Sequence, residues 1–273
     1  MNQPDIRLNS RLFLLLIPLL LLPVTGQAQQ APDTASQSAA SHALTAGYYR
    51  ARGDFGLNID TTISYLPLSY EMDRGKWGFQ LLTALLEVEG PGAVLINLGG
   101  VNQAVAGTEI TREQGVGDAI ASAIYHFDST SADAAFFDLR LDVKLPTASE
   151  NKGLGTGEVD YNLQLDVSQQ WRSLLLFSSI GYSIRGKSDL FTGLRNGAYV
   201  QLGAAMNLGD SLSGGVFYDY REPTSDFTPE SHDLSPYLSW RLSDHWTVTS
   251  LLSKGFTAAS PEWSFYTSLR YNW

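Results

Sequence analysis

The sequence predicts an all-β protein, a transmembrane antiparallel up-and-down β-barrel of about 12 strands. Three observations lead to this prediction. An export signal opens the chain, apolar and polar residues alternate through the body, and loop length alternates from one strand to the next. Strands with lipid on one side and a lumen on the other show this period of two, and an even strand number returns both ends to the periplasm.

The N-terminus predicts export. Arg7 and Arg11 precede the apolar run LFLLLIPLLLLPV, and the small residues Gly26 and Ala28 follow it. This pattern predicts a signal peptide over residues 1–28, cut after Ala28. An uncleaved anchor helix is the alternative, but the run is shorter than the roughly 20 apolar residues of a membrane span. Residues 29–42 are rich in Ala, Ser and Gln without an apolar period, which predicts a flexible periplasmic lead-in.

Residues 43–273 are predicted to form the barrel. In AFFDLRLDVKL, for example, Leu139 and Leu141 share one face while Arg140 and Asp142 share the other. Helical spacing is absent. The expected strands are 43–53, 57–71, 76–88, 115–127, 133–146, 157–169, 173–186, 196–208, 211–223, 231–242, 245–257 and 261–273.

The connections between these strands differ in length by position. Short links follow the even-numbered strands, and the long ones, 89–114, 147–156, 187–195 and 224–230, follow odd-numbered strands. Short periplasmic turns and longer external loops are typical of outer-membrane barrels. A soluble sandwich gives no reason for such sorting.

The last strand ends in WSFYTSLRYNW, with an apolar and aromatic face that closes on the terminal residue. A C-terminal aromatic strand of this kind resembles the insertion signal of the barrel-assembly machinery. That machinery and outer-membrane lipid are therefore expected partners, in the outer membrane of a Gram-negative bacterium. Aromatic residues at the periplasmic strand ends are predicted to lie at the membrane interface. They are Trp77, Phe127, Trp171, Trp246 and Trp273.

Charged residues of the opposite parity are predicted to face the lumen. They are Asp138, Arg140, Asp142, Lys144, Asp160, Asp166, Arg185, Asp219, Arg221 and Arg241. They either pair across strands and fill the lumen or line a polar pathway whose charge sets selectivity. Eight strands are just filled by side chains and sixteen leave a channel, so a barrel of about 12 predicts a narrow or loop-gated lumen.

Composition excludes several other functions. The chain has no cysteine, which excludes disulfides and thiolate metal sites, and no metal or cofactor is expected. The formal charge is −10 without a cluster of Lys and Arg, which argues against nucleic acid as a partner. The segment KGLGTGEV lacks the Lys-Ser/Thr of a phosphate-binding loop and predicts an external loop instead.

The four histidines do not predict an enzyme. Ser231, His232 and Asp233 are consecutive, and neighbouring strand residues point to opposite faces, so these three cannot form a triad alone. His126 lies near Ser129 on the periplasmic side, away from the outer leaflet that lipid hydrolases attack. An outer-membrane lipid-modifying hydrolase is therefore the weakest of the functions considered.

Three segments, GVGDAIASAIYHF (115–127), KLPTASENKGLGTGEVD (144–160) and GYSIRG (181–186), resemble one family over roughly residues 44–273. This is the outer-membrane family labelled MetA-pathway of phenol degradation, described as transporters or porin-like barrels. The resemblance implies uptake of aromatic or other hydrophobic compounds. It supplies no functional residues.

The predicted function is an outer-membrane channel or transporter that takes up small molecules, aromatic or hydrophobic compounds among them, through a narrow or loop-gated polar lumen. A closed structural or adhesive barrel that binds through its external loops, above all 89–114, is the alternative. A barrel for hydrophobic substrates would show an apolar patch in the lumen or a gap to the lipid. The sequence does not decide between these.

Overall fold

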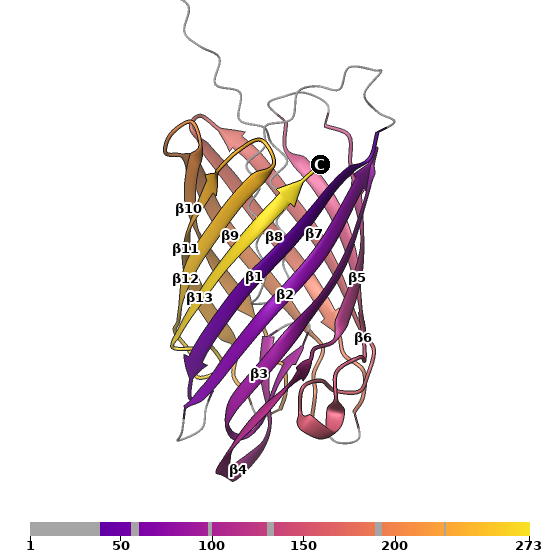
Figure 1. Ribbon diagram of the computed structural model, residues 1–273, viewed down its shortest axis with the longest axis vertical. Coiled ribbons are helices and arrows are strands. Elements are labelled where there is room, and N and C mark those ends of the chain that lie inside the picture. The colour runs from indigo at the N-terminus through magenta and orange to yellow at the C-terminus, as the bar shows by residue number, and fades with distance from the viewer. Residues whose placement is uncertain (1–38, 56–59, 98–99, 130–133, 189–192, 227) are drawn as a thin grey trace, which may run out of the picture.

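A computed structural model describes residues 39–55, 60–97, 100–129, 134–188, 193–226 and 228–273. It is an all-β barrel whose strands pair antiparallel with their neighbours (Figure 1). The first strand pairs with the last over ten residue pairs, from Ala43–Asn272 to Arg52–Trp263, and this seam closes the ring. The predicted fold class is confirmed. The predicted signal peptide and most of the lead-in lie outside the described residues.

The strands have the following bounds. They are β1 (Ser41–Gly53), β2 (Thr61–Arg74), β3 (Trp77–Asn97), β4 (Gly100–Val116), β5 (Ala119–His126), β6 (Phe136–Leu145), β7 (Asp160–Trp171), β8 (Leu174–Ile184), β9 (Gly197–Asn207), β10 (Leu212–Arg221), β11 (Ser231–Arg241), β12 (Trp246–Gly255) and β13 (Trp263–Asn272). One 3-10 helix (Glu150–Lys152) lies between β6 and β7. The described residues contain no helix that is long and apolar enough to cross a membrane.

Twelve strand positions make the ring because β4 and β5 share one position. Both pair with the same edge of β3, β5 with residues 77–82 and β4 with residues 85–97. Between them, the Gly117 amide donates to the Ala84 carbonyl oxygen over 2.8 Å, so the ladder continues through the break.

The prediction of a loop at 89–114 is wrong. Residues of this range extend β3 and β4 into a long hairpin, irregular near Pro91 and Ala93, that projects beyond the barrel at the lower end of Figure 1. A hairpin outside the membrane is held together by backbone hydrogen bonds between its strands. It does not contact lipid, so its sequence does not need an apolar residue at every second position. Without that requirement the alternation disappears, and the sequence resembles a loop.

The parity prediction is confirmed on the central strands. Leu141 and Leu163 are 47% and 53% exposed on the outside. Arg140 and Asp142, which flank Leu141 in the chain, are 1% and 0% exposed on the inside. Apolar side chains on the outer surface of a closed ring have no core to enter, so their exposure defines a lipid-facing band.

The short connections and the C-terminus lie together at the upper end of Figure 1, which is the periplasmic end of a barrel with this loop asymmetry. The five predicted interface aromatics all lie at this end of their strands, and each is between 40% and 54% exposed. Trp273 stacks on His42 with ring centroids 5.5 Å apart, and the backbones of these two residues exchange hydrogen bonds of 3.0 Å. The C-terminal residue therefore stabilises the pairing of β1 with β13.

Candidate functional site

The inner faces of β6 and β7 contain no apolar side chain from Asp138 to Lys144 and from Asp160 to Asp166. We call this surface the charged wall. It consists of Asp138, Arg140, Asp142, Lys144, Asp160, Asn162, Gln164 and Asp166. Six of these eight were predicted lumen charges, and all six lie on the inner face.

The centre of the charged wall is an ion pair within one strand. Nε of Arg140 lies 2.6 Å from a carboxylate oxygen of Asp142, and both side chains are buried. Arg140 also donates to Gln80 over 2.8 Å and to Ser122 over 2.6 Å, and Asn162 donates to Asp142 over 2.9 Å. A buried ion pair is stable only when further hydrogen bonds satisfy its remaining atoms, as they do here.

Lys144 occupies the external part of the charged wall. Its ammonium nitrogen lies 2.9 Å from Asp160 and 3.0 Å from Asp118, and it donates to the Thr156 hydroxyl over 2.8 Å. The ammonium group thus has two carboxylates within ion-pair distance and one hydrogen bond to a hydroxyl. Asp118 was not predicted, although the expected strand 115–127 contains it and it shares the parity of the inward Ser122 there.

The remaining carboxylates of the charged wall also have partners. Asp138 contacts Nδ1 of His126 at 2.7 Å, near the periplasmic end. Asp166 accepts from the Gln164 amide over 2.7 and 2.9 Å and from the Ser179 hydroxyl. Each of the six predicted charges on this wall thus has a polar partner among the described residues.

The other four predicted lumen charges fall into two groups. Arg221 pairs with Asp219 at 2.7 Å, both buried on β10, and Arg185 donates to the Arg195 carbonyl oxygen. Arg241 differs from them. It is exposed at the periplasmic end of β11 and donates to the Asp210 carbonyl oxygen in a turn over 2.7 Å, so its prediction as a lumen residue is not supported by its position.

The sequence prediction missed a further inward pair, Glu71 and Arg270, which lie 2.5 Å apart across the barrel seam. Both share the inward parity of their strands, so parity could have found them. Glu71 was missed because apolar and polar residues alternate only weakly in β2. Arg270 was missed because only the aromatic face of β13 was considered.

A second inner surface is apolar, and we call it the apolar wall. It consists of Leu175, Phe177, Ala205, Phe217, Tyr237 and Leu251, all buried, on the neighbouring strands β8 to β12. Six strand steps separate β6 from β12 in either direction around the ring, so part of the apolar wall faces the charged wall across the barrel. It was not predicted, because a strand such as LLLFSS has apolar residues of both parities.

Glycines allow the rings of the apolar wall to lie against the strands. A Cβ atom at Gly203 would lie 2.2 Å from the Phe177 ring, and one at Gly215 would lie 2.8 Å from the Tyr237 ring. Each glycine is the direct cross-strand partner of the ring that covers it. The rings therefore take up the space above the glycine backbone rather than the centre of the barrel.

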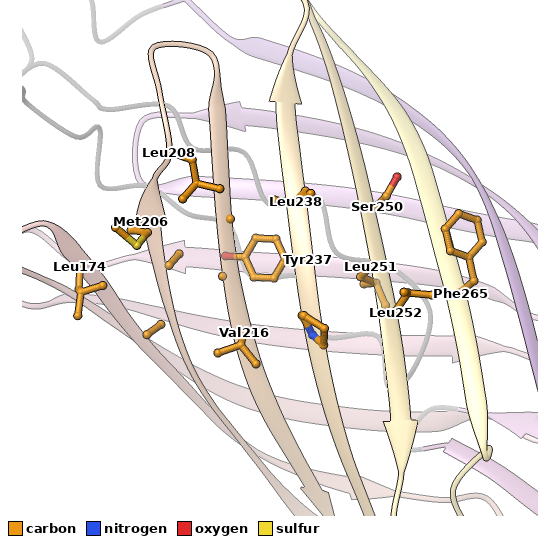
Figure 2. A pocket seen from close by; sticks show the side chains of 15 residues that line it. Leu174, Met206, Leu208, Val216, Tyr237, Leu238, Ser250, Leu251, Leu252 and Phe265 are labelled. Carbon is orange, nitrogen blue, oxygen red and sulfur yellow. The ribbon is translucent and has the colours of Figure 1, made fainter.

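Outside the apolar wall, the lipid-facing surface is hollowed (Figure 2). The hollow has a volume of about 680 Å³, and Ala204, Gly214 and Pro236 leave room for it between larger residues such as Leu238 and Phe265. Tyr237 and Leu251 also line the hollow. The hollow is therefore lined by residues of both faces of the sheet.

The pairing of β11 with β12 is interrupted at the same place. Leu234 pairs with Lys254 and Tyr237 with Leu251, but no pair is formed by the two residues between, Ser235 and Pro236. Proline has no backbone N–H to donate to the ladder, which accounts for the interruption. On the inner side the hydroxyls of Ser235 and Ser253 join the strands over 2.6 Å.

The partners seen for the histidine rings in the described part of the chain include tyrosine, aspartate and backbone groups. The rings contact Tyr70 (His42), Asp138 and Asp73 (His126), Tyr218 (His232) and the Asn272 carbonyl (His245). In the described part of the chain, no group of three or more His, Cys, Asp or Glu side chains could hold a metal ion.

The comparisons with known proteins place the fold among outer-membrane channels. The barrel is similar to an outer-membrane channel from Pseudomonas putida F1, with 13% identity over 89% of this chain and 99% of that one and a TM-score of 0.64. It is also similar to the KdgM porin, with 10% identity over 83% of this chain and 98% of that one and a TM-score of 0.51. No protein-family model and no curated protein matches the chain. The fold is thus that of an outer-membrane β-barrel.

Proposed function

We propose that this protein is an outer-membrane channel for the uptake of small hydrophobic molecules, aromatic compounds among them. The observation that carries the proposal is the apolar wall. The lumen of a transmembrane barrel that passes only water-soluble solutes is polar. Phe177, Phe217 and Tyr237 lie buried on the lumen side instead, so a pathway that widens here would expose an apolar surface to a passing molecule. The similar barrels of an outer-membrane channel and a porin support the proposal at the level of the fold.

The lining of the lumen also supports a narrow or gated pathway. Most inward side chains on the central strands are buried, so the pathway has to widen, or a loop has to move, before a solute passes. The resemblance of the segments at 115–127, 144–160 and 181–186 to the MetA-pathway family is consistent with aromatic cargo, which we include in the proposal.

Transport in cells tests this function. In a porin-deficient Gram-negative host, we expect expression of the barrel to raise the initial uptake rate of radiolabelled toluene and to leave that of a disaccharide unchanged. In planar bilayers the same barrel should conduct ions weakly, because its lumen is narrow. Equal toluene uptake with and without the protein would overturn the proposal.

A closed structural or adhesive barrel is the second candidate, and the complete pairing of the charged wall favours it. Paired buried charges fill space without requiring water. The projecting β3–β4 hairpin would then be the binding element. A wild-type barrel that conducts no ions and admits no solute, while a hairpin deletion abolishes cell adhesion, would support this candidate over the channel.

Export and insertion belong to the same proposal. The mature chain should begin near Gln29, behave as a heat-modifiable band in outer-membrane fractions, and lose assembly when the C-terminal residue Trp273 is deleted. N-terminal sequencing and gel mobility measure these outcomes. Recovery of a soluble periplasmic monomer would contradict them.

A further inference from the structure

Three polar residues form a row across the inner face on the external side of the apolar wall. Gln201 on β9 is the cross-strand partner of Asp219 on β10, and Asp219 is in turn the partner of Asp233 on β11. Directly opposed residues on one face have Cβ atoms about 4.5–5.5 Å apart, so the three side chains are immediate neighbours. We call Gln201, Asp219, Asp233 and the adjacent Arg221 the polar row.

In the charged wall, the buried atoms without a hydrogen bond of normal geometry lie in ion pairs, at 2.6 Å between Arg140 and Asp142 and 2.9 Å between Lys144 and Asp160. The polar row differs because several of its buried atoms have neither a hydrogen bond nor an ion-pair contact among the described residues. Gln201 is 1% exposed, and among the described residues neither its amide nitrogen nor its amide oxygen has a hydrogen-bond partner. Nη1 of Arg221 also has no hydrogen-bond partner in the described part of the chain, although Nε and Nη2 of the same side chain contact Asp219.

Asp233 adds an acceptor to the polar row. Its carboxylate is 2% exposed and interacts with the Ser260 hydroxyl. It nevertheless has no hydrogen bond of normal geometry among the described residues. Leaving a buried polar group without a partner costs about 1–3 kcal/mol. Several such groups side by side indicate a function that outweighs their cost in stability.

The polar row adjoins the apolar wall directly. Phe217 is two residues from Asp219 on the same face of β10, and its ring lies 6.2 Å from the ring of Tyr237 on β11. Gln201 likewise is two residues from Gly203, whose position the Phe177 ring covers. Polar atoms that need partners and an apolar surface therefore meet at one place on the inner face.

We propose that the polar row and the apolar wall together form a binding site for an uncharged amphipathic molecule with a hydroxyl group. The inference rests on the proposed channel function, since the site lies in the lumen. The hydroxyl would donate to Asp233 or to the Gln201 oxygen and accept from the Gln201 nitrogen or from Arg221. The apolar body would lie against Phe217 and Tyr237.

The polar row disfavours charged head groups. A carboxylate would approach Asp219 and Asp233, while the neighbouring Arg221 already pairs with Asp219. An ammonium ion would suit Asp233 but would leave the donors of Gln201 and Arg221 without an acceptor. A hydroxyl both donates and accepts, so it suits the mixed set.

Binding to the purified barrel in detergent tests the site without requiring transport. The probes are 1-naphthalenemethanol, 1-methylnaphthalene and 1-naphthoate, which share one ring system and differ in the head group. Their fluorescence is titrated against wild type, Gln201→Leu, Asp233→Asn and the control Gln170→Leu, which changes a glutamine at the periplasmic end of β7.

We expect the alcohol to bind wild type about tenfold more tightly than the hydrocarbon, as one additional buried hydrogen-bonding group implies. The preference should disappear in Gln201→Leu, fall several-fold in Asp233→Asn and persist in Gln170→Leu. Because Gln201 has no partner to lose among the described residues, Gln201→Leu should also fold with an unchanged or higher denaturation midpoint. Lower affinity with undiminished stability is a result that a purely structural glutamine would not give.

The inference is overturned if wild type binds the alcohol no more tightly than the hydrocarbon, as it would if only water occupied the row. It is also overturned if Gln201→Leu keeps the preference. If the barrel does not increase toluene uptake but still binds the alcohol preferentially, the proposed channel function is contradicted and the proposed binding site is not. If toluene uptake is increased but the alcohol binds no more tightly than the hydrocarbon, the binding site is contradicted and the channel function is not.

Discussion

The charged wall and the apolar wall belong to the same barrel but solve the problem of a buried inner face differently. On β6 and β7 every predicted charge has an ion-pair or hydrogen-bond partner, as Arg140 has in Asp142, Gln80 and Ser122. On β8 to β12 aromatic rings cover glycines, and the polar row beside them keeps atoms without partners.

The difference indicates where solute recognition takes place. A network that is already satisfied gains little from a ligand, because each new hydrogen bond replaces an existing one. Unsatisfied groups gain a full hydrogen bond, and an apolar surface gains contact area. The charged wall therefore stabilises the closed ring, and the inner face of the strands that follow it, β8 to β12, is the part of the lumen that binds.

The largest effect is expected from removing one partner of the ion pair in the charged wall. Asp142→Leu leaves Arg140 buried without its carboxylate, which costs about 3–5 kcal/mol. A urea refolding titration in lipid vesicles measures the loss. The matched change in the polar row, Gln201→Leu, should cost nothing.

The double variant Arg140→Met with Asp142→Leu separates charge from volume. Replacing a whole buried pair by apolar residues is often neutral, so the double variant should recover most of the stability that the single variant lost. If Asp142→Leu alone proved neutral, the charged wall would not be a satisfied network and the contrast between the walls would fail.

The next effect concerns the two faces of β6. Leu141→Arg places a charge against hydrocarbon beside the inward Asp142, and near the membrane midplane this costs about 2–4 kcal/mol. Leu141→Met, which keeps the side chain apolar, is the control and should be nearly neutral. The refolding midpoint in vesicles is the measurement. A tolerated arginine would mean that the outer face of β6 does not contact lipid.

A smaller effect is expected on the apolar wall. Gly203→Ala puts a Cβ atom 2.2 Å from the Phe177 ring, which has to move toward the centre of the barrel at a cost of about 1–3 kcal/mol. We expect slower toluene uptake as well as lower stability. Gly209→Ala is the control, because its Cβ would meet no atom within 4 Å. Unchanged uptake in Gly203→Ala would show that solutes do not pass Phe177.

The sequence predicted the elements on which the membrane imposes a pattern. Lipid requires an apolar outer face, so period-two alternation placed ten strands well and identified the inward charges of β6 and β7. The β3–β4 hairpin was missed because no membrane constrains it. Asp118, whose carboxylate lies 3.0 Å from Lys144, was missed although the expected strand 115–127 contains it on the inward parity.

The apolar wall and the polar row could not be read from single strands. Phe177 belongs to the inner face only because Gly203, which pairs with it from the next strand, leaves it room. Gln201 is informative only because its neighbours leave it without partners. Both facts depend on the register between strands, which alternation within one strand does not specify.

The smallest effect is expected at Arg241, which parity had assigned to the lumen and which the fold places in solvent at the periplasmic end. Its side chain donates to the Asp210 carbonyl oxygen over 2.7 Å and has no carboxylate partner within ion-pair distance among the described residues. Surface substitutions of this kind change stability by about 0.5 kcal/mol or less. We therefore expect Arg241→Ala to leave both the refolding midpoint and the ion selectivity in planar bilayers unchanged. Arg221→Ala, of the same residue type but paired with Asp219 in the polar row, should lower stability and shift selectivity toward cations, because it removes a positive charge beside two carboxylates. If Arg241→Ala shifted selectivity as strongly as Arg221→Ala, the periplasmic end of β11 would belong to the pathway, and the polar row would not be the point where the lumen discriminates between solutes.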